Sequence, residues 1–254
     1  MDKSDIDLSG MAAFVTGGGG GIGRAAALCL ADMGADVAIV DVIPERCEQM
    51  IAEIEKRGRK ALALPVNVMD VEALQHAVQA AADTFGRLDV LVNNAGYQMA
   101  RRESMADVTT EDLDRVLRTN LYAMFWLTQA ALEHLSDGAS IINTSSIQAY
   151  QPSTGLIDYA ATKAAINNFT VNLAAELGAR GIRVNAVAPG PIWTPLQPAT
   201  QPPEKIEQFG SDTPLGRAGQ PAEVAPAFVF LASTGDASYV SGTVLGVTGG
   251  KPVF

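Results

Sequence analysis

Short apolar runs alternate with longer helical patterns along the whole chain. The runs are rich in β-branched residues and show no polar alternation, which is typical of strands that are buried on both faces of a sheet. The helical patterns between them are long enough to connect parallel strands. We expect strands at 12–15, 36–40, 61–66, 89–92, 140–143, 183–187 and 243–247, and helices at 24–33, 44–57, 71–85, 110–135, 159–177 and 221–231. The sequence therefore predicts an α/β fold with a doubly wound, parallel, seven-stranded sheet and helices on both faces.

A single domain is expected over residues 1–254, because α/β folds of this length are commonly one domain and no linker divides the chain. Residues 1–8 are expected to be a flexible N-terminus. Six of the thirteen prolines lie between Pro189 and Pro203. This density is expected to exclude regular structure and indicates a loop over 189–215 that covers a substrate. A stiff surface connection is the alternative.

A glycine-rich turn, Thr16 to Gly23, joins the first expected strand to the first expected helix. Strand, glycine turn and helix start in this order are typical of a Rossmann dinucleotide site, where the backbone N–H groups and the positive end of the helix approach a pyrophosphate. A flexible loop is the alternative, but such a loop needs neither the strand nor the helix. The predicted contacts are Gly17, Gly21, Ile22 and Gly23.

Asp41 ends the second expected strand, 24 residues after Gly17. A carboxylate at this place accepts hydrogen bonds from the ribose of an adenosine and repels a 2′-phosphate, which favours NAD over NADP. The alternative is a solvated carboxylate or a helix cap before Pro44. Arg46 is close enough in sequence to reach a 2′-phosphate, so NADP is not excluded.

Tyr159 and Lys163 lie four residues apart in an Ala-rich stretch without proline, so a helix places both side chains on one face. A free tyrosine titrates at about 10, and a phenol that acts as a base near pH 7 to 8 needs roughly 3 to 4 kcal/mol of preferential phenolate stabilisation. A neighbouring ammonium can supply much of that. Because an ordinary amphipathic helix can carry the same pair, this pattern alone does not decide the function.

Taken together, these motifs resemble the short-chain dehydrogenase/reductase family. The motifs that carry the resemblance follow the family order from about Leu8 to Gly250, and they are 16–23, 93–96, Asn120, Ser146, Tyr159 with Lys163, and Pro189-Gly190. Residues 148–152, 158–163 and 189–197 further resemble a bacterial subgroup of general aldehyde or alcohol oxidoreductases. The resemblance implies an NAD(P)-dependent oxidoreductase that transfers a hydride between nicotinamide and a secondary alcohol or carbonyl.

The resemblance also implies roles for four residues. Tyr159 would be the general acid/base, and Lys163 would lower its pKa and hold the nicotinamide ribose. Ser146 would hydrogen-bond the substrate oxygen, and Asn120 would complete a water-linked proton relay to Lys163. Ser145 is the competing serine, but the 13-residue offset to the tyrosine matches the family at Ser146.

Further cofactor contacts follow from the resemblance. Asn67 and Val68 would contact the adenine; relatives usually have Asp in place of this Asn, so we expect an altered contact. The remaining predicted cofactor contacts are Asn94, Ala95, Gly96, Pro189, Ile192 and Thr194, although the turn at 93–96 has the alternative of simply closing a strand corner. Thr248 stands where many relatives carry an acid, and no function is predicted for it.

Substrate-facing side chains are predicted from the same motifs, and they are Gln98, Gln148, Tyr150, Trp193 and Gln197. Glutamine and tyrosine groups favour a hydroxylated substrate such as a sugar, a polyol or a small keto compound. The pair Arg101-Arg102 would attract an anionic substrate, but paired arginines beside Glu103 also suit a solvated loop.

The net charge of −10 and the pI near 4.6 argue against nucleic acid and against anionic membrane surfaces as partners. No metal is expected, because neither the two His nor the two Cys have zinc-ligand spacing. Cys29 is expected in the core, and Cys47 is expected near a helix surface. Two unpaired cysteines and the absence of a signal-like N-terminus predict a cytoplasmic protein.

Two other functions stay open. A 3-oxoacyl-carrier-protein reductase would need a basic docking patch, for which Arg101, Arg102, Arg115 and Arg118 are candidates. A non-catalytic dinucleotide-binding sensor would not need the four catalytic residue types.

The resemblance also implies a homotetramer built through the helices 110–135 and 159–177 and the C-terminal segment.

Overall fold

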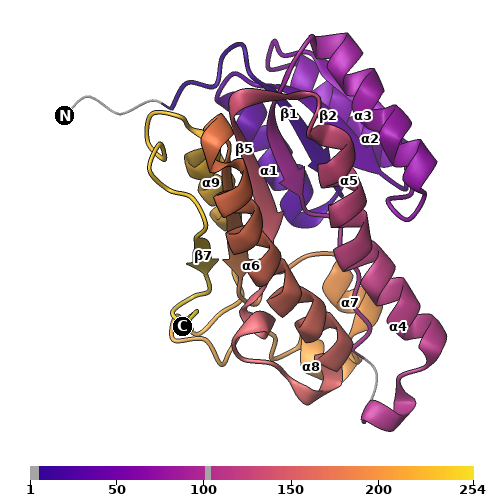
Figure 1. Ribbon diagram of the computed structural model, residues 1–254. Coiled ribbons are helices and arrows are strands. Elements are labelled where there is room, and N and C mark those ends of the chain that lie inside the picture. The colour runs from indigo at the N-terminus through magenta and orange to yellow at the C-terminus, as the bar shows by residue number, and fades with distance from the viewer. Residues whose placement is uncertain (1–5, 101–103) are drawn as a thin grey trace.

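The computed structural model of the protein describes residues 6–100 and 104–254, and it has a parallel sheet at its centre (Figure 1). The strands are β1 Ala12–Thr16, β2 Asp36–Asp41, β3 Ala61–Pro65, β4 Leu88–Asn93, β5 Leu135–Thr144, β6 Arg183–Pro189 and β7 Val244–Val247. They form one seven-stranded sheet in the order β3-β2-β1-β4-β5-β6-β7. The predicted doubly wound fold is confirmed. The strand order reverses between β1 and β4, which is where such sheets bind ligands at their carboxyl edge.

Helices cover both faces of the sheet, as predicted. The longer ones are α1 Gly21–Asp32, α2 Pro44–Glu55, α3 Val71–Phe85, α4 Thr110–Leu117, α5 Ala123–Ala131, α6 Ile157–Leu177 and α9 Pro221–Ala232. Successive residues of β1 enter two different cores: Ala13 packs with α1, α2 and α9, whereas Phe14 packs with α3, α5 and α6. Since both faces of the strand are buried, its sequence is apolar throughout.

The prediction of a single helix over 110–135 is wrong. The structure interrupts it with a π-helical turn, Arg118–Tyr122, and ends it at Ala131. In this turn the Asn120 amide donates to Tyr97 O at 2.9 Å and accepts from Tyr97 N at 2.7 Å, so the extra residue of the π turn coincides with the attachment of Asn120 to the segment after β4.

The expectation that the prolines exclude regular structure is also wrong. Two short helices lie there, α7 Leu196–Thr200 and α8 Pro203–Ile206. Proline is compatible with the first turn of a helix, where no intrahelical partner is available for the N–H, and Pro203 is the first residue of α8.

The burial of three residues differs from what the sequence predicted. Leu8 is 1% exposed and its N–H donates to Met33 O at 2.8 Å, so the expected flexible N-terminus does not extend to it. Cys47, expected near the surface, is buried on the inner face of α2 beside Met50. Cys29, expected in the core, is only partly buried.

No helix in the described part of the chain is both long enough and apolar enough to span a membrane.

Candidate active site

The four residues that we predicted to be catalytic lie together at the carboxyl edge of the sheet. Ser146 follows β5, Tyr159 and Lys163 lie on α6, and Asn120 lies in the π-helical turn. A Cβ atom placed on Gly96 would lie 3.6 Å from Asn120 Oδ1 and 3.9 Å from Lys163 Nζ. Both side chains therefore border the turn that follows β4.

Lys163 is 3% exposed, and its Nζ lies 5.4 Å from the ring centre of Tyr159. The nitrogen donates to the backbone oxygen of Thr144 at 2.6 Å. Burial disfavours the charged form and lowers the pKa of Lys163 to about 7. The ammonium and the neutral amine thus coexist near neutral pH.

The pKa of Tyr159 differs from the sequence expectation. We expected Lys163 to lower it, but burial raises the pKa of the phenol, and a hydrogen bond with Ser146 opposes that rise only in part. The physical reason is desolvation, which disfavours both the phenolate and the ammonium at this depth. In the cofactor-free protein the phenol is therefore protonated at neutral pH.

Asn120 uses its amide to hold other residues, because it also donates to Thr162 Oγ1 at 3.2 Å in addition to its two bonds with Tyr97. Beside it lies a narrow recess of about 10 Å³ that is lined by Asn120, Lys163 and Asn93 among others. This is close to the smallest space that holds one water molecule. Asn93 Oδ1 is buried there without a hydrogen-bond partner in the described chain, and a water in the recess would satisfy it.

The glycine turn packs against Asn94. Gly17 has a φ of +62°, and a Cβ on Gly23 would lie 2.2 Å from Gly17 O and 2.4 Å from Asn94 Nδ2. Asn94 Nδ2 donates to Thr16 O at 3.0 Å. These two glycines are thus required by the close approach of Asn94 to the turn. Sequence reasoning missed this, since it assigned them to cofactor contact alone.

Several predicted cofactor residues lie at the start of α1. In the described chain no side chain caps this N-terminus, where Gly20 is the capping residue, and the first N–H groups of a helix have no partner within it. Asp41 borders the glycine turn, because its Oδ2 accepts from Gly19 N at 3.1 Å. A Cβ on Gly21 would lie 3.3 Å from the Thr194 methyl, so Thr194 lies against the start of the helix.

The other predicted cofactor residues lie at or after the ends of β3, β4 and β6. Asn67 Oδ1 already accepts from Met69 N at 3.0 Å, which leaves one lone-pair direction for an adenine. Val68 and Ala95 line the recess beside Lys163. Pro189 ends β6, and Ile192 forms a backbone bridge with Gly219.

Two of the predicted substrate residues meet each other. Gln98 is buried, and its Nε2 donates to Gln197 Oε1 at 3.4 Å and to Thr200 Oγ1 at 3.1 Å, so α7 is attached to the segment after β4. Trp193 is 41% exposed and packs against Phe209, with ring centres 6.1 Å apart. Arg101 and Arg102 lie outside the described residues.

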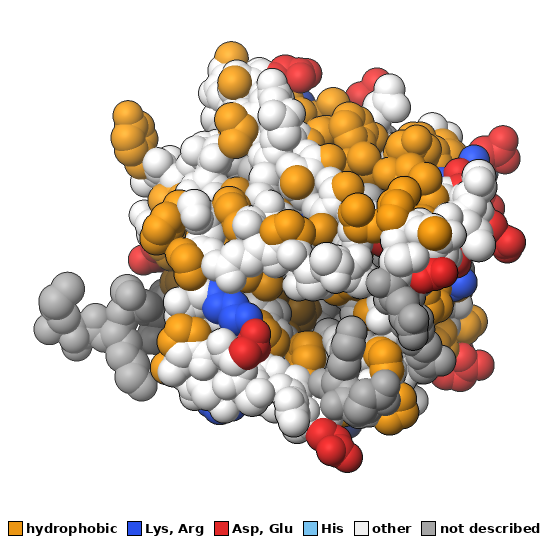
Figure 2. Space-filling model, turned by 90° about the horizontal axis from the view of Figure 1, so that it is seen from below, with side chains coloured by type: hydrophobic (Ala, Val, Ile, Leu, Met, Phe, Trp, Pro, Cys, Tyr) orange, Lys and Arg blue, Asp and Glu red, His pale blue; other side chains and the backbone are white. Residues whose placement is uncertain are grey.

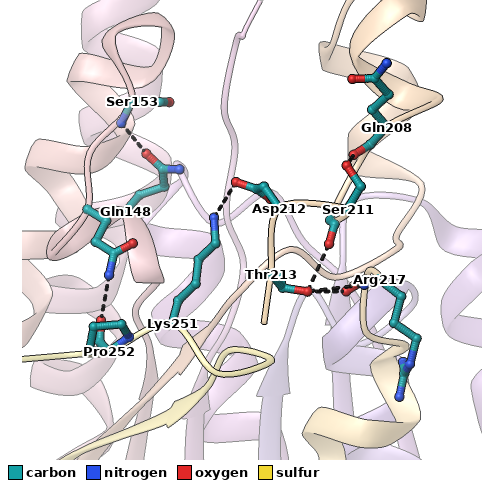
Figure 3. Close-up of polar contacts among 11 residues, drawn as sticks. Gln148, Ser153, Gln208, Ser211, Asp212, Thr213, Arg217, Lys251 and Pro252 are labelled. Carbon is teal, nitrogen blue, oxygen red and sulfur yellow. Dashed lines mark hydrogen bonds and ion pairs between the residues drawn. The ribbon is translucent and has the colours of Figure 1, made fainter. Parts of the chain in front are cut away.

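Gln148 and Tyr150 lie in the turn after Ser146. The Gln148 carboxamide accepts from Ser153 N at 2.7 Å, so it closes its own loop (Figure 3). Burial raises the pKa of Tyr150.

The sequence did not predict the role of Thr144, because the group that holds Lys163 is a backbone oxygen, and no residue type indicates such a contact. Among the described residues, no cluster of three or more His, Cys, Asp and Glu could hold a metal ion.

Comparisons with known proteins cover nearly the whole chain. A family model described as enoyl-(acyl carrier protein) reductase matches residues 17–251. The uncharacterized oxidoreductase YghA of Escherichia coli is 51% identical over 242 residues, which are 94% of this chain and 82% of that protein. NADPH-dependent aldehyde reductase 1 of Arabidopsis thaliana is 46% identical (97% and 88% covered), and the glucose and ribitol dehydrogenase homolog of rice is 47% identical (96% and 86% covered).

Solved structures are similar over the same extent. A short chain dehydrogenase from Burkholderia cenocepacia in complex with NADP has a TM-score of 0.89 and 40% identity, with 96% of this chain and 98% of that chain covered. A 3-ketoacyl-(acyl-carrier-protein) reductase from Brucella melitensis complexed with NADH has a TM-score of 0.89 and 33% identity, with 96% and 99% covered.

Proposed function

This chain belongs to the short-chain dehydrogenase/reductase family of NAD(P)-binding oxidoreductases, and we propose that it oxidises or reduces a small hydroxylated molecule at a secondary alcohol or carbonyl group. The observation that carries the proposal is that Ser146 lies near enough to Tyr159 to act on its phenol, with Lys163 on the same helix face and its Nζ 5.4 Å from the ring centre. A rate measurement with NAD and NADP over a panel of secondary alcohols, polyols and aldoses tests it. Binding of NADH without turnover of any panel member would favour the non-catalytic sensor instead.

The residues have complementary tasks in this mechanism. When bound, the nicotinamide ring accepts or supplies the hydride. Ser146 hydrogen-bonds the substrate oxygen, and Tyr159 exchanges the proton with that oxygen. Lys163 holds the nicotinamide ribose and, when protonated, supplies the positive charge that favours the phenolate. The recess beside Lys163 has room for the water that a proton relay past Asn120 requires.

The residues that would hold the cofactor surround the glycine turn and the carboxyl edge of the sheet. The N–H groups at Gly21 and Ile22 would bind the pyrophosphate, and Asp41 would bind the adenosine ribose. Thr194 would contact the nicotinamide half, and the remaining contacts are those predicted for Gly17, Gly23, Asn67, Val68, Asn94, Ala95, Gly96, Pro189 and Ile192.

NAD is the preferred cofactor in our proposal, because the Asp41 carboxylate repels a 2′-phosphate. NADP is also used, since the guanidinium of Arg46 lies at the glycine turn: a Cβ on Gly20 would be 3.4 Å from Arg46 Nη1. The name of the Arabidopsis relative and the NADP complex from Burkholderia support use of the phosphorylated cofactor.

A sugar, polyol or small keto compound is the proposed substrate class. The carboxamides of Gln98, after β4, and Gln197, in the covering segment, form a hydrogen-bonded pair. Hydroxyl groups suit such a wall, because they both donate to and accept from carboxamides. The name of the rice relative supports this class.

Reduction of 3-oxoacyl groups on a carrier protein is the second candidate, supported by the Brucella structure and by the description of the family model. Two of the four candidate docking arginines are engaged locally, since Arg118 pairs with Asp114 at 3.2 Å and Arg115 lies 4.0 Å from the ring centre of Tyr97. On the face in Figure 2, the coloured surface shows few Lys and Arg side chains, and acidic side chains lie both beside them and along the rim. A carrier-dependent enzyme would prefer carrier-bound to free substrate and lose activity steeply with salt.

A homotetramer in the cytoplasm is the proposed state. Phe125 on α5 is 48% exposed and packs against Phe169 of α6 with ring centres 4.4 Å apart, and Val171 on α6 is 52% exposed. Apolar side chains across two neighbouring helices suit a contact with a second copy.

The cytoplasm is the proposed compartment, because the two free cysteines suit a reducing environment.

A further inference from the structure

We propose that the C-terminal segment 248–252 braces the substrate cleft, and that Lys251 is a positioning residue for substrate binding. The brace joins two walls: the limb 208–217 of the covering segment, and the loop 147–153 that follows Ser146. The link to substrate binding rests on the function proposed above.

Two adjacent residues of the brace contact opposite walls. Lys251 Nζ lies 2.5 Å from Asp212 Oδ2 in the limb. The backbone oxygen of Pro252 accepts from Gln151 Nε2 at 3.2 Å in the loop. Figure 3 shows Lys251 reaching across to Asp212 while Pro252 lies on the side of Gln148 and Ser153.

The brace has a fixed shape of its own. Thr248 Oγ1 donates to Lys251 O at 2.6 Å, which closes the turn over two glycines. Gly250 has a φ of +103°, and a Cβ there would lie 2.7 Å from Pro214. Leu215 N donates to Gly249 O at 3.1 Å, so backbone and packing contacts both join the turn to the limb. This gives Thr248 the role that the sequence did not predict.

Only part of the limb is well packed, since Thr213 is buried whereas Leu215 is not. A cavity of about 210 Å³ lies behind it, lined by Ile192, Thr213, Leu215 and Gly249 among others. That space holds several water molecules at about 30 Å³ each. Leu215 is 68% exposed, so it adds little apolar packing. The contacts with the brace therefore position the limb together with the ion pair of Arg217 with Glu223 of α9 at 2.6 Å.

Both walls connect to the reacting groups. On one side, Gln148 N donates to Ser146 Oγ at 3.1 Å, within the turn that carries Gln151. On the other side, the limb packs Phe209 against Trp193 and runs on to Gly219, which pairs with Ile192. A change in the brace would therefore alter the gap between Ser146 and the covering segment without touching Tyr159 or Lys163.

The variants Lys251→Met, Lys251→Arg and Asp212→Asn test the brace. We expect Lys251→Met and Asp212→Asn to raise KM for the alcohol about two- to fivefold, the scale of one partly exposed ion pair, with kcat and the Kd for NADH unchanged. Lys251→Arg should have the wild-type KM, because it keeps the positive charge that pairs with Asp212. The double variant Lys251→Met/Asp212→Asn has no larger effect than either single one. The matched control is Lys56→Met, which removes a lysine from an exposed ion pair with Glu53 on α2.

Hydrogen exchange supplies a readout that needs no substrate. In Lys251→Met, amides of 206–218 and of 148–154 should exchange faster than in the wild type, and in Lys56→Met they should not. Unchanged exchange in both segments would overturn the brace, whether or not a substrate has been found. Faster exchange with an unchanged KM would overturn the positioning role. Failure of the wild type to turn over any alcohol would count against the proposed function and leave the exchange result to decide the brace.

Discussion

Tyr159 and Lys163 share one face of α6, yet the ammonium donates to the Thr144 backbone oxygen and not to the phenol, whose ring centre lies 5.4 Å away. Burial acts on both groups in the same sense, because it disfavours each charged form. Burial therefore favours the neutral form of the pair over its ionic form in the cofactor-free protein.

Stability of the cofactor-free protein should increase with pH above neutrality. The pKa of Lys163 falls from 10.5 to about 7 on folding, so between these values the unfolded chain binds more protons than the folded one. This group alone raises the free energy of unfolding by up to about 1.4 kcal/mol per pH unit. Urea unfolding at pH 7, 8 and 9 measures the slope. Lys163→Met should flatten it, and an equal slope in that variant would contradict the assignment.

Replacement of Asp41 by Asn should shift cofactor preference toward NADP. The change removes the charge that repels a 2′-phosphate and keeps one side-chain oxygen, which can accept from only one of the N–H groups of Gly19 and Ile43 that now donate to the two carboxylate oxygens. We expect the ratio of kcat/KM for NADP to that for NAD to rise about tenfold or more, equivalent to about 1.4 kcal/mol. Arg46→Ala should lower the same ratio. A ratio unchanged in both variants would mean that neither residue meets the 2′ position.

Gly23→Ala should unfold or strongly destabilise the protein, whereas Gly20→Ala should be tolerated. A Cβ at Gly23 meets Gly17 O and Asn94, but a Cβ at Gly20 meets only the end of the Arg46 side chain. Overpacking of this kind costs about 1 to 3 kcal/mol or more. Comparison of the two variants by urea unfolding tests the packing. If the Gly23→Ala and Gly20→Ala variants were equally stable, the close packing of Asn94 and Gly17 against Gly23 would not require a glycine there.

Light scattering should give four times the chain mass of 26.6 kDa. Phe125→Glu should lower that mass, because it places a carboxylate in the proposed contact between copies. Val42→Glu is the control, since Val42 is also exposed, at 64%, but lies between β2 and α2 and not on α5 or α6. A monomeric wild type at micromolar concentration would contradict the tetramer.

Sequence reasoning predicted the fold well because the sheet is buried on both faces. Residues such as Ala13 and Phe14 enter different cores, so a strand such as β1 is almost entirely apolar and is easily distinguished from the helices. The order of the motifs along the chain then placed Ser146, Tyr159 and Lys163 at one edge of the sheet, because parallel strands all end there.

What sequence reasoning missed depends on tertiary contacts. One extra residue in the π turn at Asn120 hardly changes the helical periodicity, so the interruption has no pattern of its own. Cys47 stands between charged neighbours, yet its own position faces the core with Met50. The effect of Lys163 on Tyr159 depends on burial, which no spacing reveals.

Turnover by Tyr159→Phe tests the central claim most directly, because the phenol is proposed to exchange the proton with the substrate oxygen. We expect kcat to fall about 10²- to 10⁴-fold, while the Kd for NADH stays within about threefold of the wild-type value. Tyr239→Phe, which changes a fully exposed tyrosine, should keep the wild-type rate. Near-full activity of Tyr159→Phe would contradict the account.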